Sequence, residues 1–149
     1  MKIYPDTSFL FSLYVADANS QSAVSIHQSY NRALPLTAFH RIELLNALCL
    51  AVFRKQITQA IADAAWQNIE TDLRNGTLYF ETVVWTDVLN EAENIVKQYS
   101  AIYGNRSLDV LHIATAKILG ADHFITFDAR QASLAARLGI SVSPIRPSI

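Results

Sequence analysis

Cysteine, glycine and proline are all scarce in this chain: among 149 residues there are one cysteine, Cys49, four glycines and four prolines. A single cysteine excludes an intramolecular disulfide framework and a metal site built from clustered cysteines. So few glycines and prolines leave little room for linkers, and no repeat or low-complexity segment is present. The sequence therefore predicts one domain over residues 1–149, in a reducing, cytoplasmic environment.

An excess of charge of either sign is also missing. Twelve Lys and Arg residues oppose thirteen Asp and Glu residues, for a formal net charge of −1. No overall positive field attracts nucleic acid, so a nucleic-acid partner would have to be held by a local site. The 51% hydrophobic content excludes a disordered chain, and with only 17% charged residues it predicts a surface partly covered by a partner or a second copy.

The sequence has no long uninterrupted hydrophobic run. Its most apolar stretch, residues 42–53, contains Glu43 and Asn46 and ends before two basic residues. This stretch is shorter than the roughly 20 residues that a membrane-spanning helix needs. Asp6 stands where a signal peptide would carry its apolar region, so no membrane association is expected.

Short apolar runs alternate with longer segments in which apolar residues recur every three or four positions. Strands are expected at residues 3–4, 34–37, 78–84, 123–127 and 140–142, and helices at 8–15, 18–30, 39–54, 58–75, 86–103, 107–119 and 128–138. Strands separated by helices predict a three-layer α/β domain, with five short parallel strands flanked by helices. Such sheets bind ligands beyond the carboxyl ends of their strands.

Four acids occupy positions that this fold would bring to one edge of the sheet. Asp6 and Asp128 each follow a predicted strand, and Asp109 lies in the first turn of a predicted helix. Glu43 lies near the start of the most apolar helix, where a buried carboxylate is unfavourable unless it meets a cation. Four carboxylates in one crevice would repel each other and favour a hard divalent cation, Mg²⁺ or Mn²⁺.

Each acid taken alone also has a structural explanation. Asp128 and Gln131 have the spacing of a capping box, and Asp6 fits the cap of the helix that follows it. Asp109 is favoured by the helix dipole, and Glu43 by pairing with a neighbouring basic residue. Zinc is not indicated, because the four histidines lack a zinc-binding spacing: His27, His40, His112 and His123.

Four segments, in this order and at these separations, resemble the PIN-domain ribonucleases and, among them, the VapC-type toxins of toxin–antitoxin pairs. The resemblance covers essentially the whole chain and rests on Asp6–Ser8, Arg41–Leu44, Arg106–Ala116 and Thr126–Asp128. Pro5 departs from the aliphatic residue usual before the first acid. Because proline has no N–H, it predicts a first strand less firmly tied to its neighbour.

The resemblance implies a sheet with strand order 3-2-1-4-5, a homodimer, and inhibition by a small antitoxin protein. It implies hydrolysis of single-stranded or loop RNA. It also implies that one or two Mg²⁺ or Mn²⁺ ions are bound by Asp6, Glu43, Asp109 and Asp128.

Residues beside the acids are candidate substrate contacts. Thr7 and Ser8 either hydrogen-bond a metal-bound water or simply start a helix. Arg41, Arg106 and Arg130 each lie within three residues of an acid, where they would bind phosphates or balance the local charge.

Three further residues are better explained by structure than by substrate binding. His112 shares a helix face with apolar residues, which favours a half-buried structural histidine. Trp66 lies on a helix with core spacing and Trp85 ends a predicted strand, so both are expected in the core or an interface and not against bases.

These observations and the resemblance predict a metal-dependent endoribonuclease that leaves a 5′-phosphate and a 3′-hydroxyl and acts as a translation-inhibiting toxin. Two alternatives stay open. An aspartyl-phosphate phosphotransferase would use Asp6 as nucleophile, but Ser8 stands where its second acid would be expected. A non-catalytic PIN-like protein-binding module has no need for four repelling carboxylates. The helices at 39–54 and 86–103 carry more apolar surface than a small sheet covers, which predicts a dimer or antitoxin contact.

Overall fold

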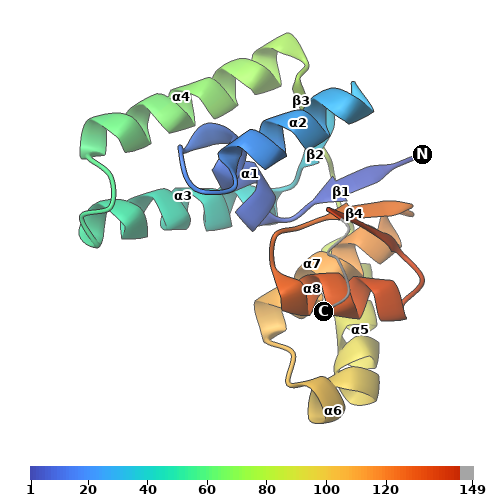
Figure 1. Cartoon of the computed structure of the whole chain (residues 1–149). Helices are drawn as coiled ribbons and strands as arrows, with labels where there is room; N and C mark the ends of the chain where they lie inside the picture. Colours follow the sequence, from blue (N-terminus) through green and yellow to red (C-terminus); the bar gives the residue numbers. More distant parts are fainter. Residues whose placement is uncertain (145–149) are drawn as a thin grey trace. The chain divides into compact units, whose positions relative to one another are not determined.

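The computed structural model describes residues 1–144, in which short strands alternate with helices (Figure 1). The strands are β1 (Ile3–Pro5), β2 (Leu34–Leu36), β3 (Leu78–Phe80), β4 (His123–Ile125) and β5 (Ser141–Ser143). The helices are α1 (Thr7–Tyr14), α2 (Ser20–Tyr30), α3 (Ala38–Phe53), α4 (Gln59–Asn75), α5 (Trp85–Ile95), the π-helix η1 (Val96–Ser100), α6 (Ala101–Tyr103), α7 (Ser107–Ile118) and α8 (Ala129–Arg137). The predicted α/β class, with parallel strands flanked by helices, is confirmed.

Several element boundaries differ from prediction, two of them for a visible reason. The strand expected over 34–37 ends at Leu36, because the Thr37 hydroxyl accepts a hydrogen bond from the His40 N–H and caps α3. The strand expected over 78–84 ends at Phe80, since its partner β2 offers only three residues for pairing. The helix expected over 86–103 is interrupted by a π-helical segment at Val96–Ser100.

The strands form two parallel sheets, in the order β1-β4-β5 and β2-β3. Three neighbour pairs of the expected order 3-2-1-4-5 are therefore present, but one continuous five-stranded sheet is not formed within the described part of the chain. Each strand has only three residues, and one of the three is a proline in both β1 (Pro5) and β2 (Pro35). A proline cannot donate to a ladder, so such short strands have few groups left for a second neighbour.

The chain divides into two compact units: a first unit of Met1–Asp6 with the segment from Thr82 onward, and a second unit of Thr7–Glu81. In the first unit, α5, α7 and α8 pack with the three-stranded sheet around a core that includes Tyr4, Ile113 and Phe124. The Tyr4 and Phe124 rings stack with centroids 5.6 Å apart. The core thus fixes β1 to β4, the two strands that Asp6 and Asp128 follow.

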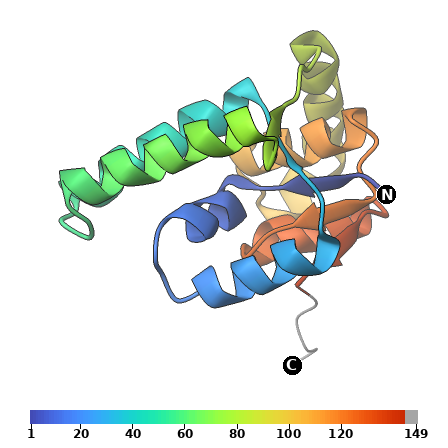
Figure 2. The same ribbon diagram turned by 90° about the horizontal axis from the view of Figure 1, so that it is seen from above.

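In the second unit, α3 and α4 run alongside each other (Figures 1 and 2), joined by a turn in which Lys55 has a positive φ of 57°. Helix α4 begins at the cap Thr58 and ends at Gly76, whose φ of 83° favours glycine. Leu48 and Ala65 are among the buried residues between these helices.

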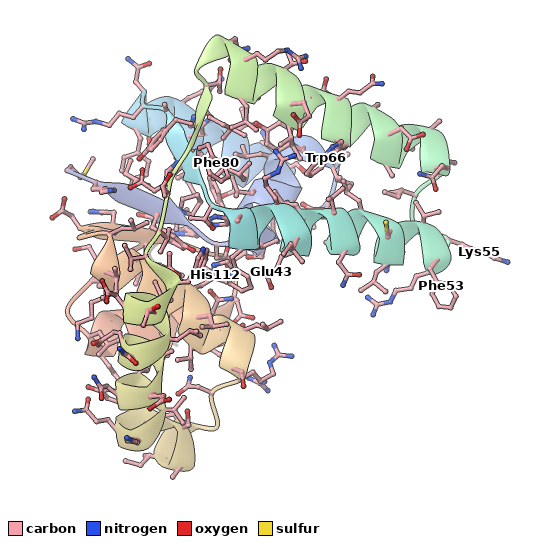
Figure 3. The ribbon with its side chains drawn as sticks, turned by 180° about the vertical axis from the view of Figure 1, so that it is seen from behind. Glu43, Phe53, Lys55, Trp66, Phe80 and His112 are labelled. Atoms are coloured by element: carbon pink, nitrogen blue, oxygen red, sulfur yellow. The ribbon has the colours of Figure 1, made fainter. Side chains whose placement is uncertain are left out.

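Several large apolar side chains stay exposed on the helices predicted to have surplus apolar surface. On α3, Ile42 is 69% exposed and Phe53, at the end of the helix in Figure 3, is 82% exposed. In the first unit, Leu89 on α5 and Ile102 on α6 are exposed as well. Over residues 1–144, no helix is both long enough and apolar enough to cross a lipid bilayer.

Candidate active site

Asp6 lies at the carboxyl end of β1 and is fully buried. Its N–H donates to the Ile125 carbonyl over 2.9 Å, and its Oδ2 accepts a hydrogen bond from the Thr126 hydroxyl over 2.6 Å. The loose strand end predicted from Pro5 is therefore wrong, because the Asp6 N–H bonds to β4, whereas the N–H that Pro5 lacks would have pointed away from β4. The backbone of Asp6 is thus held by β4, and its carboxylate is held by Thr126, the residue after β4.

Asp128 is tied to Asp6 through the same threonine. Its N–H donates to Thr126 Oγ1 over 2.9 Å, so one hydroxyl accepts from Asp128 and donates to Asp6. The Asp128 carboxylate caps α8, since its Oδ1 accepts from the N–H groups of Arg130 and Gln131 over 2.8 and 3.1 Å. The cap read from the sequence is present, but the Gln131 side chain does not bond back to Asp128 as a capping box requires.

The Gln131 side chain instead reaches Asp109 in the first turn of α7. Its Nε2 donates to Asp109 Oδ1 over 3.1 Å, and Arg106 Nε lies 3.4 Å from Asp109 Oδ2. Gln131 is 6% exposed and Asp109 is 8% exposed. Hydrogen bonds thus connect Asp6, Asp128 and Asp109 within the first unit, through Thr126 and Gln131, two residues that the sequence did not identify as site residues.

The residues of the first unit fit a divalent cation that keeps several of its waters better than a cation enclosed by carboxylates alone. Within residues 1–144, no three His, Cys, Asp or Glu side chains are gathered as a ready-made metal site. However, two carboxylates are nearly buried there, and Gln131 Oε1 is buried with no hydrogen-bond partner among the described residues. Mg²⁺ is commonly held by one or two carboxylates and keeps several waters, which would supply the donor that this oxygen lacks. The oxygen-only donor set therefore fits Mg²⁺ or Mn²⁺.

Glu43 belongs to the second unit, on α3 (Figure 3), where its Oε1 accepts a hydrogen bond from Thr7 Oγ1 over 2.6 Å. Thr7 is the residue that follows Asp6 in the chain. Ser8 lines a depression of about 340 Å³ in the same unit, together with Thr7 and Arg54. Glu43 and Thr7 are thus brought together as a pair, a contact that neither reading of Thr7 included. Thr7 is also the first residue of α1.

The three arginines beside the acids have different surroundings. Arg41 Nη2 lies 2.6 Å from Glu70 Oε1, and its guanidinium carbon is 4.9 Å from the Trp66 ring centroid. Arg41 is therefore paired with an acid 29 positions away on another helix, and Trp66 is an arginine-stacking residue on α4. Arg106 pairs with Asp109 but keeps a side chain that is 66% exposed, and Arg130 is exposed.

His112 is more deeply buried than expected, at 2% exposure. Its Nδ1 lies 2.9 Å from the Tyr4 hydroxyl, and the two rings meet edge-on. His40 is also buried, in the cap at the start of α3. Trp85 packs against the core of the first unit, as predicted.

The family model for the PIN domain matches residues 3–137. The chain belongs to the PIN-domain family. PIN domains are typically nucleases, and PIN nucleases generally use a divalent metal, in agreement with the oxygen donors of this site. All four acids lie inside the matched range.

Two solved structures share the fold of this PIN domain. VapC20 from Mycobacterium tuberculosis, described as a sarcin–ricin loop cleaving toxin, is 19% identical with a TM-score of 0.67, covering 98% of this chain and 100% of that chain. FitAcB from Neisseria gonorrhoeae is 18% identical with a TM-score of 0.64, covering 94% of this chain and 95% of that chain. No curated protein sequence matches the chain.

Proposed function

We propose that residues 1–149 form one domain and that this PIN domain is a Mg²⁺- or Mn²⁺-dependent endoribonuclease. The observation that carries the proposal is the hydrogen-bonded series from Asp6 through Thr126, Asp128 and Gln131 to Asp109. This series holds two nearly buried carboxylates, those of Asp6 and Asp109. Burying a carboxylate destabilises the folded protein unless the carboxylate meets a cation. Membership of a family of nucleases supports the same chemistry.

In the proposed reaction, Asp6, Asp109 and Asp128 would hold the cation, directly or through water. When bound, a divalent cation would supply a water of lowered pKa and would offset the charge that develops on the phosphate. Water oxygen then bonds to phosphorus while the bond to the 3′ oxygen breaks, and a carboxylate takes the water proton. The 3′ oxygen leaves with a proton from solvent, so the products are a 5′-phosphate and a 3′-hydroxyl.

Side chains of the first unit orient this chemistry. Thr126 fixes the rotamer of Asp6 by donating to its Oδ2. Gln131 does the same for Asp109 by donating to its Oδ1. Its Oε1, which has no hydrogen-bond partner among the described residues, would accept from a water held by a cation. Glu43, held by Thr7 in the second unit, is proposed as a further acidic residue of the reaction.

The biological role that we propose is that of a cytoplasmic toxin that inhibits translation and is controlled by an antitoxin protein. Support comes from the fold shared with VapC20, described as a sarcin–ricin loop cleaving toxin, and from the exposed apolar residues of α3, α5 and α6. Ile42, Phe53 and Ile102 would be covered in a homodimer or under the antitoxin.

The deciding experiment is incubation of the purified chain with total RNA in Mg²⁺, in Mn²⁺ and in chelator, followed by mapping of new 5′-phosphate ends. Wild type should cut only with metal, while Asp6→Asn and Asp109→Asn should lose at least about a hundredfold in rate, or about 2.7 kcal/mol in barrier. Asp63→Asn is the matched control, since Asp63 is an exposed acid on α4. Cleavage by Asp6→Asn within tenfold of this control would refute the role of the acids.

A further inference from the structure

A second feature of the first unit lies beside the acids: a pocket of about 210 Å³ between α8 and the end of α6. The side chains that matter here are Tyr103, Asn105, Arg130 and Arg137. Arg130 is two residues from Asp128, and its own N–H donates to the Asp128 carboxylate. Asn105 precedes Arg106, the partner of Asp109. The pocket is therefore lined by one residue two positions from Asp128 and another four positions from Asp109 in the chain.

One wall of the pocket is a stack of aromatic and guanidinium groups. The guanidinium carbon of Arg137 lies 3.7 Å from the Tyr103 ring centroid, and the Tyr103 ring stacks with Tyr99 at 6.3 Å. Arg137 Nη1 also donates to the Ser133 carbonyl over 3.3 Å and to its hydroxyl. The guanidinium is thus fixed before any ligand arrives, which lowers the entropy cost of stacking a further planar group on it.

The charges of the pocket are not balanced by the protein. Arg130 and Arg137 are both exposed, and neither forms an ion pair with an acid in the part of the chain described. The Asn105 Oδ1 atom is buried and accepts no hydrogen bond there. In a chain whose net charge is −1, two adjacent cations without acidic partners form a local anion site.

A nucleotide uses all of these features at once. A simple anion would make no stacking contact with the Tyr–Tyr–Arg stack, and an apolar ligand would not pair with the two cations. Bases stack on aromatic rings and on arginine planes, while arginine binds phosphates through charge-assisted hydrogen bonds. The base must be unpaired, because bases within a duplex already stack on their neighbours.

We infer that this pocket binds one unpaired nucleotide of the RNA substrate, next to the phosphate that is cut. The base stacks on Arg137 against Tyr103, the phosphate pairs with Arg130, and Asn105 hydrogen-bonds the base edge. This inference rests on the proposed ribonuclease function and deepens it by assigning a pocket of this chain to one nucleotide of the substrate.

The test measures binding in chelator, where no cleavage occurs, by fluorescence anisotropy with a short labelled oligouridylate. Arg137→Lys keeps the charge and loses the planar group, so it should bind at least about tenfold more weakly, as should Arg137→Gln. Arg130→Gln should weaken binding and reduce the slope of log affinity against log salt by about 0.7. Lys97→Gln removes one exposed positive charge from the same unit outside the pocket and should bind as wild type.

Photocrosslinking locates the base independently of affinity. An oligonucleotide carrying 5-iodouridine should crosslink to Tyr103 or Tyr99, and the crosslink should be lost in Arg137→Gln. Binding by Arg137→Lys and Arg130→Gln equal to that of Lys97→Gln would overturn the inference. Arg130 is exposed and packs little, so Arg130→Gln decides the matter even if the Arg137 variants fold poorly.

Failure of this inference is distinguishable from failure of the proposed function. If wild type cuts RNA with metal and Asp6→Asn does not, while the pocket variants bind and cut like Lys97→Gln, the pocket assignment fails and the ribonuclease stands. If wild type and Asp6→Asn are equally inactive on RNA in every metal, the ribonuclease proposal fails and the pocket assignment fails with it.

Discussion

Gln131 offers the sharpest test of whether the buried acids form one site. Its Nε2 donates to Asp109 Oδ1 over 3.1 Å, and the side chain is almost fully buried. Gln131→Leu keeps similar bulk but removes this donor, so a nearly buried carboxylate loses a hydrogen bond. A hydrogen bond to a charged group contributes about 1.5–3 kcal/mol to stability, part of which is returned because the unpartnered Oε1 is removed too.

The expected change in chelator is therefore a loss of about 1–2 kcal/mol, or roughly 2–8 °C in melting temperature for a chain of this size. Gln131→Glu places a third carboxylate beside Asp109 and should be destabilised more in chelator through charge repulsion. The two variants should then diverge on addition of Mg²⁺. Gln131→Glu should recover most of its stability, because the new carboxylate is an additional ligand for Mg²⁺. Gln131→Leu should be stabilised by Mg²⁺ less than wild type, because a water on the cation has lost its acceptor.

Differential scanning fluorimetry with Mg²⁺ titrations, supported by isothermal titration calorimetry of metal binding, measures both effects. The matched control is Gln67→Leu, an exposed glutamine on α4 whose replacement should change neither stability nor metal response. The reasoning is refuted if all three variants show the same rise in melting temperature with Mg²⁺ as wild type. Equal responses would mean that Gln131 is only a core residue and that no cation is bound near Asp109.

Two further predictions concern the second unit. Burial, with a 2.6 Å hydrogen bond to Asp72, raises the pKa of Tyr14 above its ordinary value. Because the folded-state pKa is raised, this stabilisation is complete below about pH 10 and declines as the pH rises beyond that value, where the unfolded tyrosine ionises. Urea unfolding followed by Trp66 fluorescence should show this decline in wild type and not in Tyr14→Phe; a parallel decline in both would contradict it. Arg41→Ala should cost about 1 kcal/mol, since the partly exposed pair with Glu70 and the stacking on Trp66 are each modest, and should leave the cleavage rate within about twofold. A tenfold loss of cleavage would instead show that Arg41 contacts the substrate.

The positions of the helices, and of the acids at the ends of elements, follow from the sequence because their causes are local. The apolar spacing of α4, its cap at Thr58 and the positive φ that favours Gly76 involve residues within a few turns of each other. The same holds for Asp128, which caps the helix that begins at the next residue. Family membership was also visible, because the motifs around Asp6 and Asp109 are short and keep their order along the chain.

Only the tertiary structure determined what each acid contacts. Thr126 meets Asp6 across 120 positions in the chain, and Gln131 turns from its own helix cap to Asp109, 22 positions away. Arg41 has an acid two residues away, yet it pairs with Glu70 on another helix. The Tyr103–Arg137 stack likewise joins two elements that no local pattern connects. Such pairings depend on which surfaces pack together once the core is buried. Where a side chain has several possible partners in reach, no periodic pattern in the sequence identifies the one that it contacts.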